Sequence, residues 1–369
     1  CAMHDCIAVN WDICQKKWTA GDFILQSAEF CHCPMGTVIP PQFDTLAHAE
    51  QCCINPDGTA RLLNLPVRFQ SVQRKGSSIA AGETVLSAGE KLTPSHLAML
   101  QYTGYTDVCV KKRPKLSILP VGGDLKAPGE TPGPGENIEC NSIFICALAQ
   151  KCGAEAEIWP IVPDEESAIT EALRSLLPAC DAVVTIGGVG RGEKNYGDRT
   201  VGALRELGTI LCYGVNLSPG GKNVILGYLE DKPVLGIPGP PHAALIMSEY
   251  FLPPVIESFL GCPCGTTSEQ EVTLGMDFPV RGGTWIPRVY AEKSALGYQV
   301  RLVDNLGDTI DNFIRGIAEI SICGDASGFR KGSRVNARFL YDERTAALKM
   351  RKLSSGALRS DSLEPDHAK

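Results

Sequence analysis

The chain has 369 residues, of which 44% are hydrophobic and 21% charged, and its formal net charge is −7. This length favours two to four domains over a single core. The acidic balance disfavours broad nucleic-acid binding, and no apolar run approaches the ~18 residues that a membrane helix needs. The chain opens CAMHDCIAV, without the basic region of a signal peptide, so we expect a cytoplasmic protein that binds neither nucleic acid nor membrane.

Sixteen cysteines would indicate disulfides in a short secreted chain, but this chain is long. The close pairs are Cys31 with Cys33, Cys52 with Cys53, and Cys262 with Cys264. None has the two-residue gap of a zinc knuckle. We expect structural or reduced free thiols, with a metal or redox site and then disulfides as the less favoured alternatives.

The first part of the chain predicts short strands and one helix. Residues 1–72 hold β-like runs at 23–26 and 62–69, separated by turn signals. Within residues 79–112, a helix is expected to begin at Pro94, with Thr93 as its N-cap, and to end near Gly104.

From residue 113 to 261 the pattern alternates between strands and helices, which is typical of a parallel sheet with helices on its faces. Strands are expected at 116–119, 156–162, 181–186 and 233–238. Helices are expected at 142–151, from an N-cap at Asp164 to about 177, and from the turn at 239–241 to Gly261. Residues 262–352 turn β-rich and predict a small β domain, whereas residues 353–369 lack apolar periodicity and predict a disordered tail.

Three glycine-bearing loops follow predicted strands: VGGDL at 121–125, GGVGRGE at 187–193 and IPGPPH at 237–242. In a parallel α/β sheet, ligands bind beyond the carboxyl ends of the strands. Glycine lets backbone N–H groups approach an anion, and a following helix N-terminus adds a favourable dipole. Together the loops predict a site for a phosphate-bearing ligand, although each alone could be an ordinary turn. The GxGxxG and Walker spacings are absent, so no nucleotide fingerprint is present.

The segment VNLSPGGKNVILG, residues 215–227, has a Pro-Gly-Gly turn followed by Lys222. This turn would place an amine near an anion. The alternative is a surface hairpin with a solvated lysine.

Seven segments, in this order, resemble the molybdopterin molybdotransferase family of the MoeA and gephyrin E-domain type. They are MHDCIAV (3–9), MGTVIPPQFDTLAHAE (35–50), RPKLSILPVGGDL (113–125), NIECNS (137–142), DAVVTIGGVGRGEKNY (181–196), VNLSPGGK (215–222) and VLGIPGPPHAAL (234–245). Each is short, but all seven in order at plausible spacing are specific for the family.

The resemblance implies an α/β multidomain fold with a three-layer molybdopterin-binding domain, an extended helical/β region, a small β lid and a C-terminal β-barrel-like domain. The corresponding boundaries are 1–9 with 73–112 for the extended region, 10–72 for the lid, 113–261 for the molybdopterin-binding domain, 262–352 for the barrel and 353–369 for the tail. The family also implies an elongated homodimer. Its usual leading helix before the first motif is not matched here, which makes the dimer a less secure expectation.

The reaction that the resemblance implies is insertion of molybdate into adenylylated molybdopterin with Mg²⁺, which releases AMP and molybdenum cofactor. Asp5, Asp124 and Asp164 would be catalytic, and Asp5 and Asp124 would hold the metal ion. The expected ligand-binding residues are Gly36, Gly187, Gly188, Gly190, Gly192, Pro219, Gly220, Lys222, Pro238 and Gly239. A molybdoenzyme or another protein of the cofactor pathway is a further expected partner. We expect Gly188→Val to abolish ligand binding while leaving the fold intact.

The sequence departs from the family pattern at positions that carry chemistry. Met35, Gly123, Gly190, Asn195, Ser218, Gly221 and Pro240 stand where the family has Thr, Asp, Ser, Asp, Lys, Lys and Asn. Asp198 and Lys194 lie close to Asn195 and could compensate for its lost charge, or they could be solvated loop charges. Asp164 could equally be a helix N-cap, and Asp5 a surface acid.

Three functions therefore stay open. The first is a molybdotransferase, the second is a molybdopterin-binding carrier, sensor or subunit without insertion chemistry, and the third is an interaction protein that keeps only the scaffold.

Overall fold

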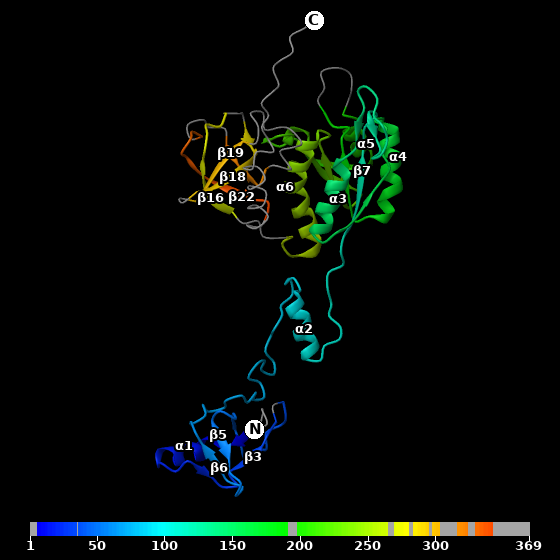
Figure 1. Ribbon diagram of the computed structural model, residues 1–369. Coiled ribbons are helices and arrows are strands. Elements are labelled where there is room, and N and C mark those ends of the chain that lie inside the picture. The colour runs from blue at the N-terminus through cyan, green and yellow to red at the C-terminus, as the bar shows by residue number, and fades with distance from the viewer. Residues whose placement is uncertain are drawn as a thin grey trace. The chain divides into compact units, whose positions relative to one another are not determined.

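The computed structural model describes residues 6–34, 36–190, 198–264, 269–279, 283–294, 297–302, 316–323 and 329–341. The chain folds as two compact units, residues 1–88 and residues 89–369 (Figure 1).

The first unit holds two small antiparallel sheets and one helix. One sheet has the order β3-β1-β4 and the other β2-β6-β5. The elements are β1 (Ile7–Val9), α1 (Trp11–Thr19), β2 (Ile24–Leu25), β3 (Phe30–His32), β4 (Thr45–Ala47), β5 (Cys52–Ile54) and β6 (Ala60–Leu62). The predicted strand at 23–26 is confirmed as β2, whereas only Leu62 of the predicted run at 62–69 lies in a strand. Helix α1 was not predicted, although Asn10 caps it by accepting the N–H of Ile13.

Helix α2 (Pro94–Tyr102) forms where the sequence predicts it. The Thr93 side chain accepts the N–H of His96, and the His96 side chain accepts the N–H of Thr93, which makes a reciprocal capping box.

A six-stranded sheet forms the centre of the second unit, in the order β10-β7-β11-β15-β14-β12. Its strands are β7 (Lys115–Pro120), β10 (Glu155–Ile158), β11 (Ala182–Ile186), β12 (Gly208–Tyr213), β14 (Ile225–Leu229) and β15 (Lys232–Ile237). The first four in the order run parallel, and β14 pairs antiparallel with both β15 and β12, so that β14 alone runs in the opposite direction. The four predicted strands are therefore present, and β12 and β14 extend the sheet beyond the prediction.

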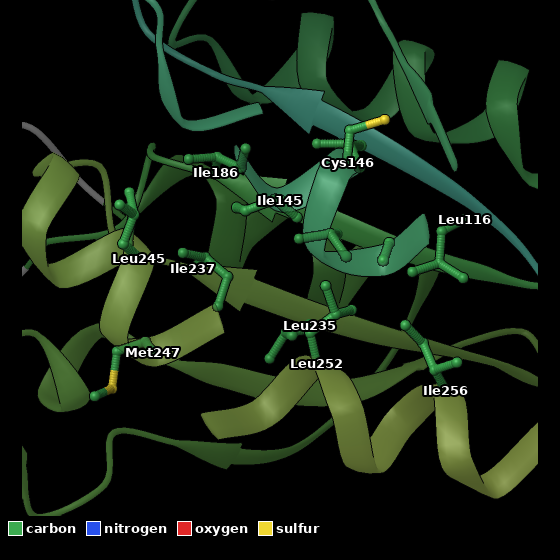
Figure 2. Close-up of a cluster of buried hydrophobic side chains, with 14 of the residues drawn as sticks. Leu116, Ile145, Cys146, Ile186, Leu235, Ile237, Leu245, Met247, Leu252 and Ile256 are labelled. Atoms are coloured by element: carbon green, nitrogen blue, oxygen red, sulfur yellow. The ribbon is translucent and has the colours of Figure 1, made fainter. Parts of the chain in front are cut away.

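Four helices cover the two faces of this sheet: α3 (Asn141–Lys151), α4 (Glu166–Leu176), α5 (Arg199–Leu207) and α6 (Pro241–Leu260). On one face, Ile145 of α3 and Leu252 of α6 pack with Leu235 of β15 (Figure 2). On the other face, Leu173 of α4 and Leu204 of α5 share a second core. Each buried side chain of this size stabilises the fold by about 1.5–3 kcal/mol.

Helix α6 is long and apolar enough to cross a membrane by length and composition, which the sequence analysis did not anticipate. Its apolar residues, however, pack against α3 and the sheet (Figure 2). This burial makes α6 a core helix of the α/β region.

A closed barrel follows α6, in the order β16-β19-β18-β20-β22. Its strands are β16 (Glu269–Leu274), β18 (Arg288–Ser294), β19 (Gly297–Leu302), β20 (Ala318–Ile320) and β22 (Arg334–Phe339). Trp285 is fully buried in its core. The remaining short elements are β8 (Leu125–Lys126), β9 (Asn137–Ile138), η1 (Leu177–Ala179), β13 (Leu217–Ser218), η2 (Gly221–Asn223), β17 (Thr284–Trp285) and β21 (Ile322–Cys323).

The cysteines whose side chains are described are all free, as expected. Burial raises the pKa of several of their thiols, to about 12 for Cys14 and to about 11 for Cys52. Such thiols stay protonated at neutral pH and are poor nucleophiles.

Candidate functional site

The three glycine-bearing loops meet at one edge of the six-stranded sheet, because β7, β11 and β15 are neighbours that run in the same direction. The N–H of Val121 donates to the carbonyl of Ile186 at 2.8 Å. The N–H of Gly187 donates to the carbonyl of Ile237 at 3.0 Å. The sheet ladder thus continues into the loops and fixes their starting points.

Gly187 and Gly188 both adopt left-handed backbone conformations, with φ of +86° and +61°. A Cβ atom on Gly187 would lie 2.3 Å from the carbonyl oxygen of Val121. A Cβ atom on Gly188 would lie 2.2 Å from Oγ1 of Thr200. Both glycines are therefore crowded by other atoms of the protein, so we expect Gly188→Val to destabilise the fold as well as to affect binding.

Asp164 lies beside this loop rather than at the cap of α4. The N-cap of α4 is Glu165, and no side chain caps that helix, so the alternative interpretation of Asp164 as an N-cap is wrong. Its Oδ1 is 3.2 Å from the Cβ position of Gly188. Among the described residues this buried oxygen has no hydrogen-bond partner. A buried acceptor without a donor is costly, so the geometry leaves room for a donor from a ligand.

The N-terminus of α3 reaches the third loop through Asn141, whose Nδ2 donates to the carbonyl of Gly239 at 2.8 Å. The backbone N–H groups of Asn141 and Ser142 both donate to Oε1 of Glu139 at 2.9 Å. The protein therefore satisfies this helix end with its own carboxylate.

The Pro-Gly-Gly turn is not a surface hairpin. Pro219 is buried, and a Cβ atom on Gly220 would lie 2.5 Å from Cβ of Ala243 in the first turn of α6 and 3.0 Å from Cγ of Pro238. The structure therefore brings Pro219 and Gly220 to the third loop. Lys222 is exposed, two residues beyond Gly220.

Gly190 and Gly123 differ from the crowded glycines. Neither has a positive φ, and a Cβ atom on either would have no described atom within 4 Å. At these two positions, where the family pattern has a serine and an aspartate, a Cβ atom fits among the described atoms.

Asp124 is exposed, and one of its carboxylate oxygens accepts Nδ2 of Asn137 at 3.2 Å. Among the described residues, no group of three or more His, Cys, Asp or Glu side chains could hold a metal ion. Mg²⁺, however, commonly takes one or two carboxylates and completes its shell with waters and substrate phosphates. As an exposed carboxylate, Asp124 fits this role.

Three predicted site residues, Asp5, Gly192 and Gly36, cannot be compared with these loops. Asp5 and Gly192 lie outside the described residues. Met35, Lys194 and Asn195, where the sequence departs from the family pattern or could compensate, also lie outside them. Gly36 belongs to the first unit, where it occupies an exposed turn with a φ of +86°.

Sequence reasoning missed Thr200 and Tyr213 and gave Glu139 no role. Thr200 is fully buried, and its Oγ1 donates to the carbonyl of Gly187 at 3.1 Å. Tyr213 donates to Asp198. The capping role of Glu139 was detectable, because an acid just before a helix is a common capping signal, whereas the long-range contacts of Thr200 and Tyr213 leave no local signal.

A second cluster of polar side chains lies along α6, away from its first turn. Glu249 of α6 pairs with Arg288 of the barrel at 2.5 Å, and Arg288 pairs with Glu319 at 3.1 Å. Arg338 pairs with Glu319 as well. Burial raises the pKa of Glu249 from its ordinary value of 4.5 to about 7, against the opposing effect of Arg288. We call these four residues the α6–barrel junction; three of them, Glu249, Arg288 and Arg338, line a groove of about 730 Å³.

Comparison with known proteins gives a consistent result. The family model "MoeA N-terminal region (domain I and II)" matches residues 5–104, and the model "Probable molybdopterin binding domain" matches residues 117–258. A molybdopterin molybdenumtransferase from Haemophilus influenzae is 29% identical over 226 residues, 61% of this chain and 55% of the relative. A molybdopterin molybdenumtransferase from Nostoc sp. is 28% identical over 246 residues, 66% of this chain and 56% of the relative. The chain thus spans about half the length of these relatives.

Among solved structures, a molybdopterin biosynthesis MoeA protein from Pyrococcus horikoshii has a TM-score of 0.75 at 22% identity, over 92% of this chain and 87% of that chain. A second structure from this organism has a TM-score of 0.68 at 21% identity. At these identities the likeness bears on the fold alone, and it confirms the predicted fold class.

Proposed function

Since the chain belongs to the MoeA family, we propose that it takes part in molybdenum cofactor biosynthesis by binding adenylylated molybdopterin at residues 187–190 and 237–240. The observation that carries this proposal is the convergence of the three glycine-bearing loops at the carboxyl edge of β7, β11 and β15. Ligands of open α/β sheets bind at this edge.

The chemistry of the loops suits a phosphate group. Helices α5 and α6 begin next to the second and third loops, and their dipoles favour an anion there. Pro240 and Pro241 have no N–H, so on the α6 side the donors would come from His242 onward. The Oδ1 of Asp164, which has no hydrogen-bond partner in the described part of the chain, would accept a hydrogen bond from a ring N–H of the pterin.

The finer part of the proposal is a transferase reaction, in which molybdate is inserted and AMP is released. Mg²⁺ would be held by Asp124, and when bound it would neutralise phosphate charge. Asp164 would orient the pterin, and the glycine-bearing loops would exclude water from the phosphate. The free thiols of the chain suit a reducing cytoplasm, and a homodimer or a cofactor-pathway partner remains part of the proposal.

A second candidate function is pterin binding without metal insertion. It is favoured by Gly123, Gly190 and Pro240, which lack the carboxylate, hydroxyl and amide of the family pattern. The loops that would receive the ligand match the family pattern more closely than the side chains that would act on molybdate.

One assay separates the two functions. Purified protein is given adenylylated molybdopterin, molybdate and Mg²⁺, and both AMP release and cofactor transfer to an apo-molybdoenzyme are followed. The transferase proposal expects both products to depend on molybdate. Retained pterin binding without turnover would overturn the transferase proposal in favour of the carrier. Absence of binding would overturn both.

A further inference from the structure

Asp198 immediately precedes α5, at the position where a side chain usually caps its own helix, yet it makes no such cap. Instead, its Oδ1 accepts the N–H of Gly190 at 2.9 Å. Its Oδ2 accepts the hydroxyl of Tyr213 at 2.7 Å. Asp198 therefore connects the second glycine-bearing loop to strand β12.

Tyr213 gives this connection a rigid support. It is the last residue of β12, and it pairs with Ile225 of β14 in the central sheet. Thr200 adds two hydrogen bonds from the first turn of α5: its N–H donates to the carbonyl of Gly188 at 3.2 Å, and its Oγ1 donates to the carbonyl of Gly187 at 3.1 Å. Consecutive residues of the loop are thus held from one side by the start of α5.

The contact at Gly190 matters most, because Gly190 has no side chain of its own that could pack against the protein. A Cβ position at Gly190 has no described atom within 4 Å, so the hydrogen bond from its N–H to Asp198 is the contact that holds it. The hydrogen bond from the Gly190 N–H to Asp198 has a charged acceptor, and such a bond is stronger than one to a neutral acceptor.

We propose that Asp198, oriented by Tyr213, is a positioning residue that fixes the backbone of residues 187–190 for the ligand. This inference rests on the proposed function, since it concerns the same loop. It also assigns Asp198 a role other than metal binding. Both carboxylate oxygens already accept hydrogen bonds from the protein, and Asp198 belongs to no group of metal-ligand side chains among the described residues.

Three variants test the proposal: Asp198→Ala, Asp198→Asn and Tyr213→Phe. The probe is adenylylated molybdopterin, titrated anaerobically with and without Mg²⁺. Asp198→Ala is expected to raise the Kd by ~10–100-fold, the range of a lost hydrogen bond to a charged group. Tyr213→Phe should raise it by ~3–10-fold. Asp198→Asn should raise it by ~3–10-fold, less than Asp198→Ala, because its Oδ1 still accepts the N–H of Gly190, as a weaker neutral acceptor, and its Nδ2 can donate to the Tyr213 hydroxyl oxygen.

Tyr228→Phe is the matched control, since Tyr228 is an exposed tyrosine on the neighbouring strand β14, and its Kd should not change. A loss in Asp198→Asn as large as in Asp198→Ala would overturn the proposal, because it would show that the charge of Asp198 acts rather than its geometry. An unchanged Kd in Asp198→Ala would overturn it as well.

Hydrogen exchange at the Gly190 amide tests the same contact without ligand. Asp198→Ala should speed this exchange at least tenfold while the midpoint of global unfolding stays within a degree or two of the wild type. If exchange at the Gly190 amide is the same in Asp198→Ala as in the wild type, the proposal is overturned, whether or not the wild type binds the pterin. If the wild type binds no pterin but exchange is faster in Asp198→Ala, only the proposed function is overturned.

Discussion

Two regions that share helix α6 differ in their polar groups: one is formed mainly by backbone groups and the other by paired charged side chains. The first turn of α6 lies at the glycine-bearing loops, where backbone groups predominate and Asp164 carries a buried oxygen that has no hydrogen-bond partner among the described residues. Further along, Glu249 joins the α6–barrel junction, where carboxylates and guanidinium groups pair closely. Glu249 has a strongly raised pKa, which often marks a functional site. In this chain the raised pKa of Glu249 belongs to the contact between α6 and the barrel. The candidate site is indicated instead by the backbone geometry of the glycine-bearing loops.

Breaking the junction should produce the largest effect. Arg288 is 4% exposed and Glu319 is 1% exposed, so Arg288→Ala would remove the guanidinium that pairs with both Glu249 and Glu319 and leave Arg338 to neutralise the two buried acids. Such a change costs about 3–5 kcal/mol. Urea denaturation should show this loss in the free energy of unfolding, while pterin affinity of the folded protein stays unchanged. A loss below about 1 kcal/mol would contradict a buried, structurally important pair.

Gly188→Val should be next, and it should affect both stability and binding. The left-handed φ of +61° costs a non-glycine residue about 1–2 kcal/mol, and the contact with Thr200 at 2.2 Å adds an overpacking cost of about 1–3 kcal/mol. Denaturation and pterin titration of the same variant check this. Full stability with lost binding would show that the loop tolerates the side chain, contrary to the crowding described here.

The junction should also give the protein a pH dependence. Because the pKa of Glu249 is raised from 4.5 to about 7, the folded state holds a proton that the unfolded chain releases. The resulting stabilisation is fully present below pH 4.5 and is lost as the pH rises through about 7. Glu319, Arg288, Arg338 and Tyr250 surround this carboxyl.

The measurement is the urea midpoint of wild type and Glu249→Gln at pH 5 and pH 8. The midpoint of the wild type should fall more between the two pH values than that of the variant. Parallel changes in the two proteins would show that Glu249 does not titrate in this range.

The smallest effect is expected from Gly190→Ser, which restores the residue type of the family. The position is open, so stability should not change. A hydroxyl that donates to a bound phosphate should lower the Kd for adenylylated molybdopterin by about 2–10-fold, the range of a neutral hydrogen bond. Weaker binding would show that the loop of this chain fits its ligand without a hydroxyl.

Much of the α/β region could be predicted from the sequence. The apolar runs of β7, β11 and β15 and the helical periodicity of Ile169, Leu173 and Leu176 are local signals. The meeting of the three loops followed from the direction of parallel strands. The domain boundaries and the roles of the site residues stay predictions.

The rest depends on contacts that are distant in sequence. Asp198 was interpretable as a compensating or a solvated charge, and only the fold brings Tyr213, 15 residues away, to its second oxygen. The junction joins Glu249 to Arg288 across 39 residues. The roles of individual glycines also depend on such contacts. No sequence pattern distinguishes Gly188, where a Cβ atom would clash with Thr200, from Gly190, where a Cβ atom has no described atom within 4 Å.

The most direct test of the account is anaerobic calorimetry of adenylylated molybdopterin with wild type and Gly190→Val. A Cβ atom at this position has no described atom within 4 Å, so the unfolding midpoint should stay close to that of the wild type. If a ligand approaches this backbone closely, the Kd should rise at least tenfold. An unchanged Kd in a protein that binds the pterin would contradict the claim that residues 187–190 receive the ligand.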